Sequence, residues 1–157
     1  MTEVLSKAII DLNVVAKTKE DVFSRLTTLL DHDGRLNDPA VYMQNVADRE
    51  ALTTTGIGFG IAIPHGKTDA VKSVSVAIAK LEQPIDWEAM DGKPVDMVFQ
   101  LAVPAASQGD AHLKLLAALS RQLIHADFRS KIKQATSEDE VIALIGNTIN
   151  QTLEVPS

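Results

Sequence analysis

Residues 54–67 most strongly limit how this chain can fold: three glycines at alternate positions precede a short apolar run, a proline and a histidine. Gly56, Gly58 and Gly60 disfavour a helix, because each glycine costs roughly 1 kcal/mol relative to alanine in a helix interior. Glycines suit a backbone that turns or packs closely against a neighbour. Residues 61–63 have the composition of a buried strand. The stretch therefore predicts a turning or closely packed segment that leads into a short strand.

His65 follows this strand directly, between Pro64 and Gly66. Pro64 lacks a backbone donor and ends regular pairing, so we expect His65 just past the end of the strand. Gly66 is expected to let the chain turn without shielding the imidazole, and Lys67 adds a positive charge nearby. An imidazole in such a place can be a base, a metal ligand or a nucleophile, or it can simply satisfy a loop hydrogen bond. The local composition leaves these alternatives open.

The composition excludes several kinds of site and partner. The 157 residues, 45% of them hydrophobic and 23% charged, fit a single domain with a sizeable core. The chain has no cysteine, which excludes disulfides, thiolate metal sites and cysteine nucleophiles. A net charge of −6 with only four Phe and one Tyr argues against nucleic acid as the main partner. No apolar run approaches ~18 residues and the N-terminus lacks a signal-peptide pattern, so we expect no membrane insertion and a cytoplasmic location.

Helix and strand signals alternate along the chain. Thr18 with Asp21 resembles a capping box and predicts a helix that ends before Gly34, and Asp38-Pro39 starts a second helix that runs to about Ala51. Strands are predicted at residues 14–16, 72–79 and 95–103, and further helices after residues 110 and 137. Such alternation indicates an α/β sheet with helices on both faces.

Two of the four histidines follow predicted strands. His65 follows the strand at residues 61–63, and His112 follows the strand at 95–103 and opens a helix, where backbone donors favour anions. Ligands of α/β sheets bind beyond the carboxyl ends of strands. His32 and His125 lie near predicted helix ends and are expected at the surface.

A site with two histidines and nearby cations suits phosphoryl transfer, since one imidazole can take the group while donors spread its charge. A zinc or iron site needs a third ligand, and no HExxH spacing is present. GxSxG, GxGxxG and P-loop motifs are also missing, which disfavours a serine hydrolase, a dinucleotide site and ATP as donor. A histidine phosphorylated without ATP must take its phosphoryl group from another phosphorylated protein.

Two segments resemble the IIA domains of the phosphoenolpyruvate-dependent sugar phosphotransferase system (PTS), fructose/mannitol class. They are Arg49-Glu50 and the stretch from Thr54 to Lys67, whose core is Ile63-Pro64-His65-Gly66-Lys67. Residues 91–95, 101–104, 109–113 and 119–121 also match. The resemblance covers nearly the whole chain, which we divide into a single IIA domain of type 2 at residues 1–150 and a tail or truncated linker at 151–157. The fructose-specific branch is most similar, and the nitrogen-related regulatory IIA protein is the close relative.

The resemblance implies an α/β fold with a mixed, mostly parallel sheet of about five strands flanked by helices on both faces. It implies that His65 is the phosphorylated nucleophile and that Arg49 and His112 flank it and steady the phosphoryl group. The implied donor is HPr or an HPr-like domain, and the implied acceptor is a cysteine of a IIB domain, with the IIC membrane component involved only indirectly. No cofactor and no metal are required by this scheme.

Several alternatives stay open at this point. The chain is a phosphoryl relay for uptake of a sugar, with fructose favoured, or a regulatory IIA protein that controls partners through its phosphorylation state. It is a standalone protein or a fragment of a multidomain permease. Arg49 binds the phosphoryl group, or it forms an ion pair with Glu50 or another acid on the helix surface. The side chains of Ile57, Phe59 and Ile63 exclude water from phosphohistidine, pack in the core, or do both.

Overall fold

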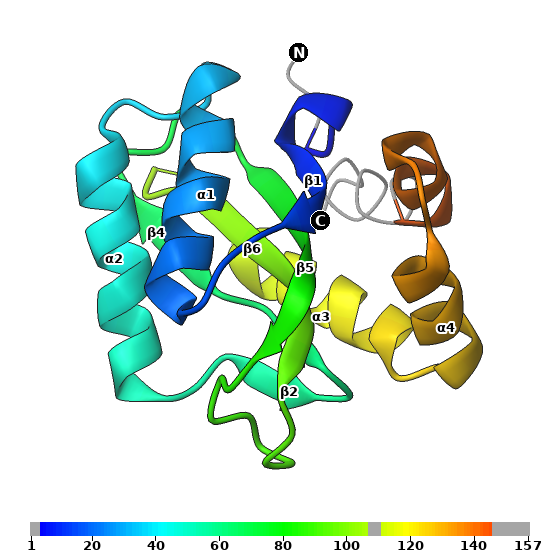
Figure 1. Ribbon diagram of the computed structural model, residues 1–157. Coiled ribbons are helices and arrows are strands. Elements are labelled where there is room, and N and C mark those ends of the chain that lie inside the picture. The colour runs from blue at the N-terminus through cyan, green and yellow to red at the C-terminus, as the bar shows by residue number, and fades with distance from the viewer. Residues whose placement is uncertain (1–3, 107–110, 146–157) are drawn as a thin grey trace.

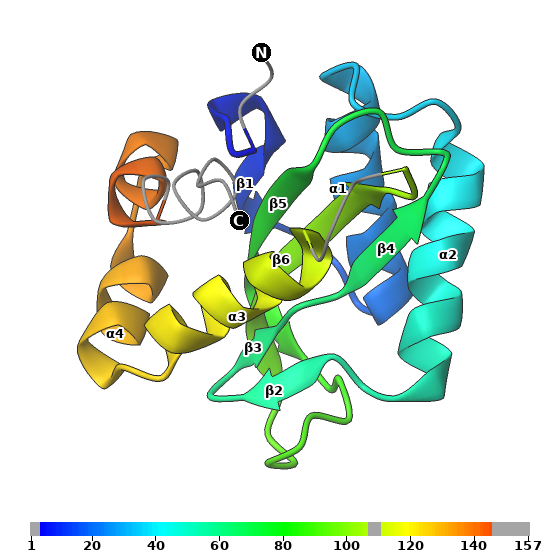
Figure 2. The same cartoon turned by 180° about the vertical axis from the view of Figure 1, so that it is seen from behind.

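The computed structural model describes residues 4–106 and 111–145, leaving the side chains of 111–113 undescribed, and places a mixed β-sheet between two layers of helices (Figures 1 and 2). One layer, in front of the sheet in Figure 1, contains α1 (Lys19–His32) and α2 (Pro39–Leu52). The other layer contains α3 (Ala111–Leu123), α4 (Ala126–Gln134) and the helical residues 138–145. Each layer forms its own hydrophobic cluster with one face of the sheet.

The described strands form one sheet in the order β1-β5-β6-β3-β2, and β4 also pairs with β6. Their bounds are β1 (Ile10–Val14), β2 (Gly56–Gly58), β3 (Ile61–Ala62), β4 (His65–Thr68), β5 (Ser75–Ile85) and β6 (Val95–Pro104), and the short 3-10 helix η1 (Lys7–Ile9) precedes β1. The pairs β1–β5, β3–β6 and β4–β6 are parallel, and the pairs β2–β3 and β5–β6 are antiparallel. This confirms the predicted α/β class with a mixed, mostly parallel sheet.

β3 and β4 lie one after the other along the same edge of β6. Ile61 of β3 pairs with Met97, and His65 of β4 pairs with Leu101, four residues further along in both strands. The six strands therefore occupy five positions across the sheet, which agrees with the expectation of about five. The break between β3 and β4 falls at Ile63-Pro64.

The first two helices begin where their capping residues predict. Thr18 Oγ1 accepts from the Asp21 backbone N–H at 3.1 Å, and the Asp21 carboxylate accepts from the Thr18 N–H at 3.2 Å. The Asp21 carboxylate also accepts from the Lys17 N–H, the largest of the causes that lower its pKa. At α2, Asp38 Oδ1 accepts from the Val41 N–H at 3.2 Å. Asp38 and Pro39 thus place the start of the helix that carries Arg49.

One expectation about element positions is wrong, and a second is confirmed only in part. The first strand is β1 (Ile10–Val14) and not residues 14–16, because Ile10 and Val14 are buried whereas Val15 is 79% exposed. The run at 72–79 belongs to β5, which begins at Ser75 and extends to Ile85. β5 can include Pro84 because its register against β6 shifts between Lys80 and Ile85. The helix α4 follows α3 after a short turn and was not predicted as a separate element.

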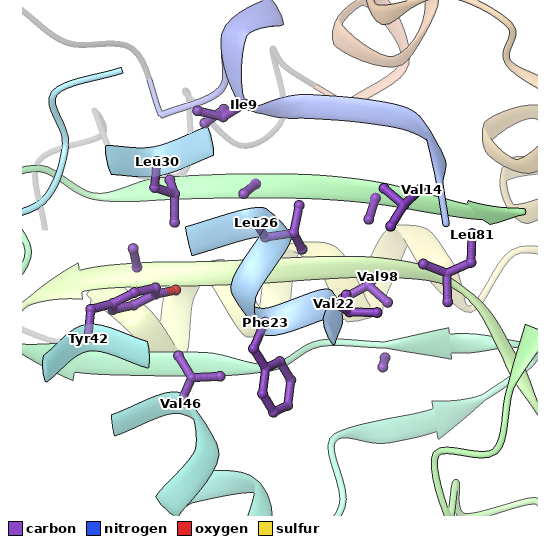
Figure 3. Packing of buried hydrophobic residues seen from close by; sticks show 14 of the residues in the cluster. Ile9, Val14, Val22, Phe23, Leu26, Leu30, Tyr42, Val46, Leu81 and Val98 are labelled. Atoms are coloured by element: carbon purple, nitrogen blue, oxygen red, sulfur yellow. The ribbon is translucent and has the colours of Figure 1, made fainter. Parts of the chain in front are cut away.

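The α1–α2 layer is fixed to the sheet by aliphatic and aromatic packing, shown in Figure 3. Phe23 of α1 meets Trp87 edge to face, with ring centroids 5.8 Å apart, and Trp87 is fully buried. Tyr42 of α2 donates its phenolic hydrogen to the Leu101 carbonyl of β6 at 2.8 Å, and burial raises the pKa of the Tyr42 phenol. This bond holds α2 against the strand that pairs with β4. None of the described helices has the length and apolar character needed to cross a membrane.

Candidate functional site

Two of the predicted site residues, Arg49 and His65, line one cleft beside α2. Arg49 lies in the last turn of α2, and His65 is the first residue of β4. The cleft has a volume of about 480 Å³. The residues that line it are Asn45, Asp48, Arg49, Leu52, His65 and Lys67. The fold therefore brings a guanidinium and an imidazole from different elements to a common opening.

The register between β4 and β6 sets the direction of the His65 side chain. His65 pairs with Leu101 and Gly66 with Ala102, and paired residues point to the same face of a sheet. Leu101 packs in the cluster that includes α3, whereas Ala102 packs in the cluster that includes α1 and α2. The His65 side chain therefore leaves β4 on the α3 side of the sheet, and Gly66 faces α2. His65 still borders the cleft beside α2, because β6 is the only described strand that pairs with β4 and the other edge of β4 is open.

The backbone around His65 differs from expectation in two ways. Pro64 does interrupt the strand, but His65 begins the next strand, so it does not lie in a loop beyond the sheet. Gly66 does not turn the chain, because it belongs to β4. A Cβ at Gly66 would lie 2.9 Å from Asn45 Oδ1 and 3.1 Å from Tyr42 Cε1. Gly66 thus lets α2 approach β4 closely and brings the Arg49 end of the helix to His65.

One contact of the imidazole indicates its tautomer. His65 Nδ1 lies 3.3 Å from the Ile63 carbonyl oxygen. A carbonyl oxygen only accepts hydrogen bonds, so Nδ1 carries the proton in this contact. In a neutral imidazole the lone pair is then on Nε2. This tautomer has the electron pair that a nucleophilic histidine needs.

The charged groups of the cleft favour an anion. Arg49 and Lys67 are cationic, and the single carboxylate, Asp48, accepts from Gln44 Nε2 at 2.8 Å. Arg49 Nη1 donates to the Thr53 carbonyl at 3.0 Å. The guanidinium has further N–H groups that can bind an acceptor such as a phosphate oxygen. In a chain of net charge −6, these two cations form a local positive site.

Glu50, next to Arg49, serves the structure and not the cleft. Its carboxylate is buried, forms an ion pair with Lys19 at 3.3 Å and accepts from the Thr55 N–H at 2.7 Å. It also accepts from Thr55 Oγ1 and from Trp87 Nε1. Glu50 thus anchors the end of α2 to the start of the glycine-rich stretch, and its ion-pair partner is Lys19, whereas Arg49 donates to a carbonyl.

The third predicted residue, His112, is the second residue of α3, and its side chain lies outside the described part of the structure. Asp110, after which this helix is predicted to begin, also falls outside the described residues. α3 packs on β6, the strand that pairs with β4. His32 and His125 are exposed near helix ends, as predicted.

The glycine-rich stretch forms a β-hairpin, β2–β3, whose turn carries Phe59 away from the cleft. Phe59 has a left-handed backbone (φ 61°) between Gly58 and Gly60, which also have positive φ. Its N–H donates to the Asp91 carboxylate at 3.0 Å. The residue is 53% exposed, and the Arg129 guanidinium lies 3.9 Å from the centroid of its ring. Phe59 is therefore not among the residues that line the cleft, because the left-handed turn places its ring beside Arg129 of α4.

A second hollow of about 610 Å³ lies between α1 and the end of α2, and it is larger than the cleft at His65. Its lining includes Lys19, Glu50 and Thr54. Lys19 and Glu50 neutralise each other there, and no histidine lines it. The chemistry of the residues therefore favours the smaller cleft as the functional site.

Asn45 and Leu52 were not predicted as site residues, and the helical spacing could have identified them. Positions 45, 49 and 52 are separated by four and three residues, so they share one face of α2 with Arg49. A projection of the helix from Arg49 would have selected both. Lys67 was noted only as a nearby charge, and the pairing of β4 with β6 places it in the cleft.

Comparison with known proteins places the chain among phosphotransferase-system domains. Residues 3–148 match the family described as "Phosphoenolpyruvate-dependent sugar phosphotransferase system, EIIA 2". The chain is 41% identical over 141 residues to the "PTS system fructose-specific EIIA component" of Haloferax volcanii, which covers 90% of this chain and 91% of that protein. It is 39% identical over 145 residues to the "PTS system fructose-specific EIIABC component" of Bacillus subtilis, which covers 92% of this chain but only 23% of that longer protein.

Two solved structures have the same fold. The nitrogen regulatory protein IIA-Ntr from Neisseria meningitidis superposes with a TM-score of 0.82 and 31% identity, over 90% of this chain and 95% of that one. A complex of IIA mannitol with phosphorylated IIB mannitol from Escherichia coli contains a chain that matches with a TM-score of 0.77 and 25% identity, over 91% of this chain and 97% of that one.

Proposed function

The chain belongs to the EIIA 2 family of the phosphoenolpyruvate-dependent sugar phosphotransferase system, and on this basis we propose that it relays a phosphoryl group through His65. The donor is phosphorylated HPr or an HPr-like domain, and the acceptor is a IIB domain. The sugar that finally receives the group is fructose. The observation that supports His65 most directly is its place in the cationic cleft with Nδ1 bonded to the Ile63 carbonyl.

The transfer is an in-line exchange between two imidazoles. The lone pair of His65 Nε2 attacks phosphorus while the bond from phosphorus to the donor's imidazole nitrogen breaks, and the electron pair of that bond leaves with the donor. The Nδ1 proton stays on His65 and continues to donate to Ile63. The positive charge that forms on the ring is balanced by the negative charge of the bound phosphoryl group. Onward transfer repeats the exchange with a nucleophile of the IIB domain.

The surroundings of His65 supply positioning and charge neutralisation, the main needs of phosphoryl transfer. Arg49, on α2, binds the phosphoryl oxygens through two N–H groups of its guanidinium. Lys67 adds a second positive charge at the cleft. His112 assists from the start of α3, and this role is supported by the direction of His65, whose side chain points to the α3 side of the sheet.

The comparisons support both the acceptor and the sugar. The Escherichia coli complex pairs a IIA protein of the same fold with a phosphorylated IIB, which supports a IIB domain as the acceptor here. Two relatives at 41% and 39% identity are named fructose-specific, which supports fructose as the sugar. The likeness to IIA-Ntr favours a second candidate, a regulatory protein whose partners respond to phosphorylation of the same histidine.

Labelling with radioactive phosphoenolpyruvate, enzyme I and HPr tests the proposal. The wild-type protein should take up label that is labile in acid and stable in alkali, as expected of a phosphoramidate. His65→Ala should take up none, because the attacking nitrogen is gone, and His125→Ala is the matched control because His125 is exposed at the start of α4. Circular dichroism should show that both variants are folded. Undiminished labelling of His65→Ala would overturn the assignment.

A further inference from the structure

Asn45 lies in the cleft, one helical turn before Arg49. Residues four apart on a helix are neighbours on one face, and both side chains line the same opening as His65. Asn45 is half-buried, so its amide belongs to the wall of the cleft and not to open solvent. Its position gives it access to whatever group His65 and Arg49 bind together.

The backbone of β4 fixes which end of the Asn45 amide faces the cleft. Asn45 Oδ1 accepts from the Lys67 N–H at 3.1 Å, and it would lie only 2.9 Å from a Cβ at Gly66. Since an amide N–H requires an acceptor, this bond identifies the oxygen and leaves Nδ2 at the other end. Nδ2 pairs with no protein acceptor among residues 4–106 and 114–145. The amide therefore brings two N–H donors to the cleft that no acceptor of the described residues uses.

From this geometry we propose that Asn45 binds the phosphoryl group carried by His65, through a hydrogen bond from Nδ2 to a phosphoryl oxygen; the inference rests on the proposed function. The guanidinium of Arg49 can bind two oxygens, and Asn45 supplies a donor for the third. Asn45 gives up no proton and forms no covalent bond, so the balance of the transfer is unchanged. A neutral donor orients the group without the extra attraction of another cation, which would oppose its departure to the acceptor.

Two substitutions separate this role from a structural one. Asn45→Asp keeps an acceptor for the Lys67 N–H and removes the Nδ2 donor, whereas Asn45→Ala removes both. Asn13→Asp is the control for the change of charge, because Asn13 is exposed on β1, and β5 and β6 separate it from β4. The measurement is the rate of labelling by phosphorylated HPr, at ~0.05 M and ~0.5 M salt, together with the melting temperature of each variant.

We expect Asn45→Asp to melt near the wild-type temperature but to be labelled at least about tenfold more slowly, the loss expected for one hydrogen bond to a charged group. The defect should persist at high salt, where repulsion by an exposed carboxylate is screened. Asn45→Ala should be slowed similarly, and Asn13→Asp should match the wild type. If Asn45→Asp is labelled like the wild type at high salt, Asn45 only holds β4 and the inference is wrong. A wild-type protein that takes no label would overturn the proposed function itself.

Discussion

At the scale of single residues, the imidazole of His65 depends on a carbonyl group only two positions earlier. Pro64 interrupts the strand between them, and the Ile63 carbonyl accepts from Nδ1 at 3.3 Å. The same bond orients the ring and selects the tautomer. The proline directly before His65 therefore has a local role: it follows the end of β3 and leaves the Ile63 carbonyl for the imidazole.

Arg49 should act on transfer and not on stability. Lysine keeps the charge of Arg49 but cannot reproduce the planar fork that matches phosphate oxygens, so Arg49→Lys should slow labelling about tenfold, equal to about 1.4 kcal/mol of transition-state stabilisation. Its free energy of unfolding should stay within about 0.5 kcal/mol of the wild type, the usual range for surface changes. Labelling rates and thermal unfolding measure the two effects.

Arg25→Lys is the matched control, because Arg25 pairs with Asp11 at 2.9 Å, outside the cleft, and is partly exposed. It should be labelled at the wild-type rate. Unchanged labelling of Arg49→Lys would show that Arg49 has no special part in binding the phosphoryl group. A rate that falls only together with the melting temperature would make Arg49 a structural residue.

Much of the candidate site could be predicted at this scale, and the remainder required the pairing of strands. The pattern around His65 and the end of α2 at Arg49 are local features of the sequence. The contact between the Lys67 N–H and Asn45 joins residues 22 positions apart, and it depends on how closely α2 approaches β4. No local pattern measures that approach, so Gly66 was misinterpreted as a turn residue and the bond from the Lys67 N–H to Asn45 was not predicted.

At the scale of elements, capping residues made helix starts predictable, whereas strand positions followed burial. Thr18 and Asp38 satisfy the first N–H groups of α1 and α2, a requirement that depends on local sequence alone. β1 was misplaced because Val15 is apolar but exposed, and which side of a short strand faces the core is decided by its neighbours. The mixed sheet came from the family resemblance, since alternation of elements alone cannot set strand direction.

The packing of α2 on β4 leads to a prediction for Gly66→Ala. The φ of Gly66 is not in the left-handed region, so alanine fits the backbone, but its Cβ would lie 3.1 Å from Tyr42 Cε1 and from Val46 Cγ2, and closer still to Asn45. Overpacking of this kind costs about 1–3 kcal/mol of stability. Because α2 would move away from β4, labelling of His65 should also slow.

Chemical denaturation and the labelling assay measure the two effects of Gly66→Ala in one preparation. The variant should unfold at lower denaturant concentration with an unchanged slope, since the fold itself is kept. If Gly66→Ala were as stable as the wild type, α2 and β4 could move apart without cost. Their close approach would then have no importance for the site.

At the scale of the whole molecule, the position of the cleft suits exchange between proteins. β4 pairs with β6, and no other described strand pairs with it, so the cleft opens beside the edge of the sheet and not inside the core. Leu52, which lines the cleft, is 81% exposed and offers apolar surface to a docking partner. In the proposed relay, the donor and the acceptor would reach His65 in turn at this opening.

The choice between sugar relay and regulator can be decided by offering the phosphorylated protein two IIB domains. If the chain is a relay of the fructose branch, its phosphoryl group should pass to a fructose-specific IIB domain and regenerate the unphosphorylated protein. A mannitol-specific IIB domain should receive it at least about tenfold more slowly, a difference of about 1.4 kcal/mol between the two transition states. The physical reason is that both acceptors offer the same chemistry, so only the fit of the protein surfaces around the cleft can distinguish them.

The experiment follows loss of label from the purified phosphoprotein and its appearance on each IIB domain, with buffer alone as the control for hydrolysis. Label that stays on His65 in the presence of both domains, and leaves only by hydrolysis, would contradict the relay and favour a protein whose phosphorylation state is itself the signal.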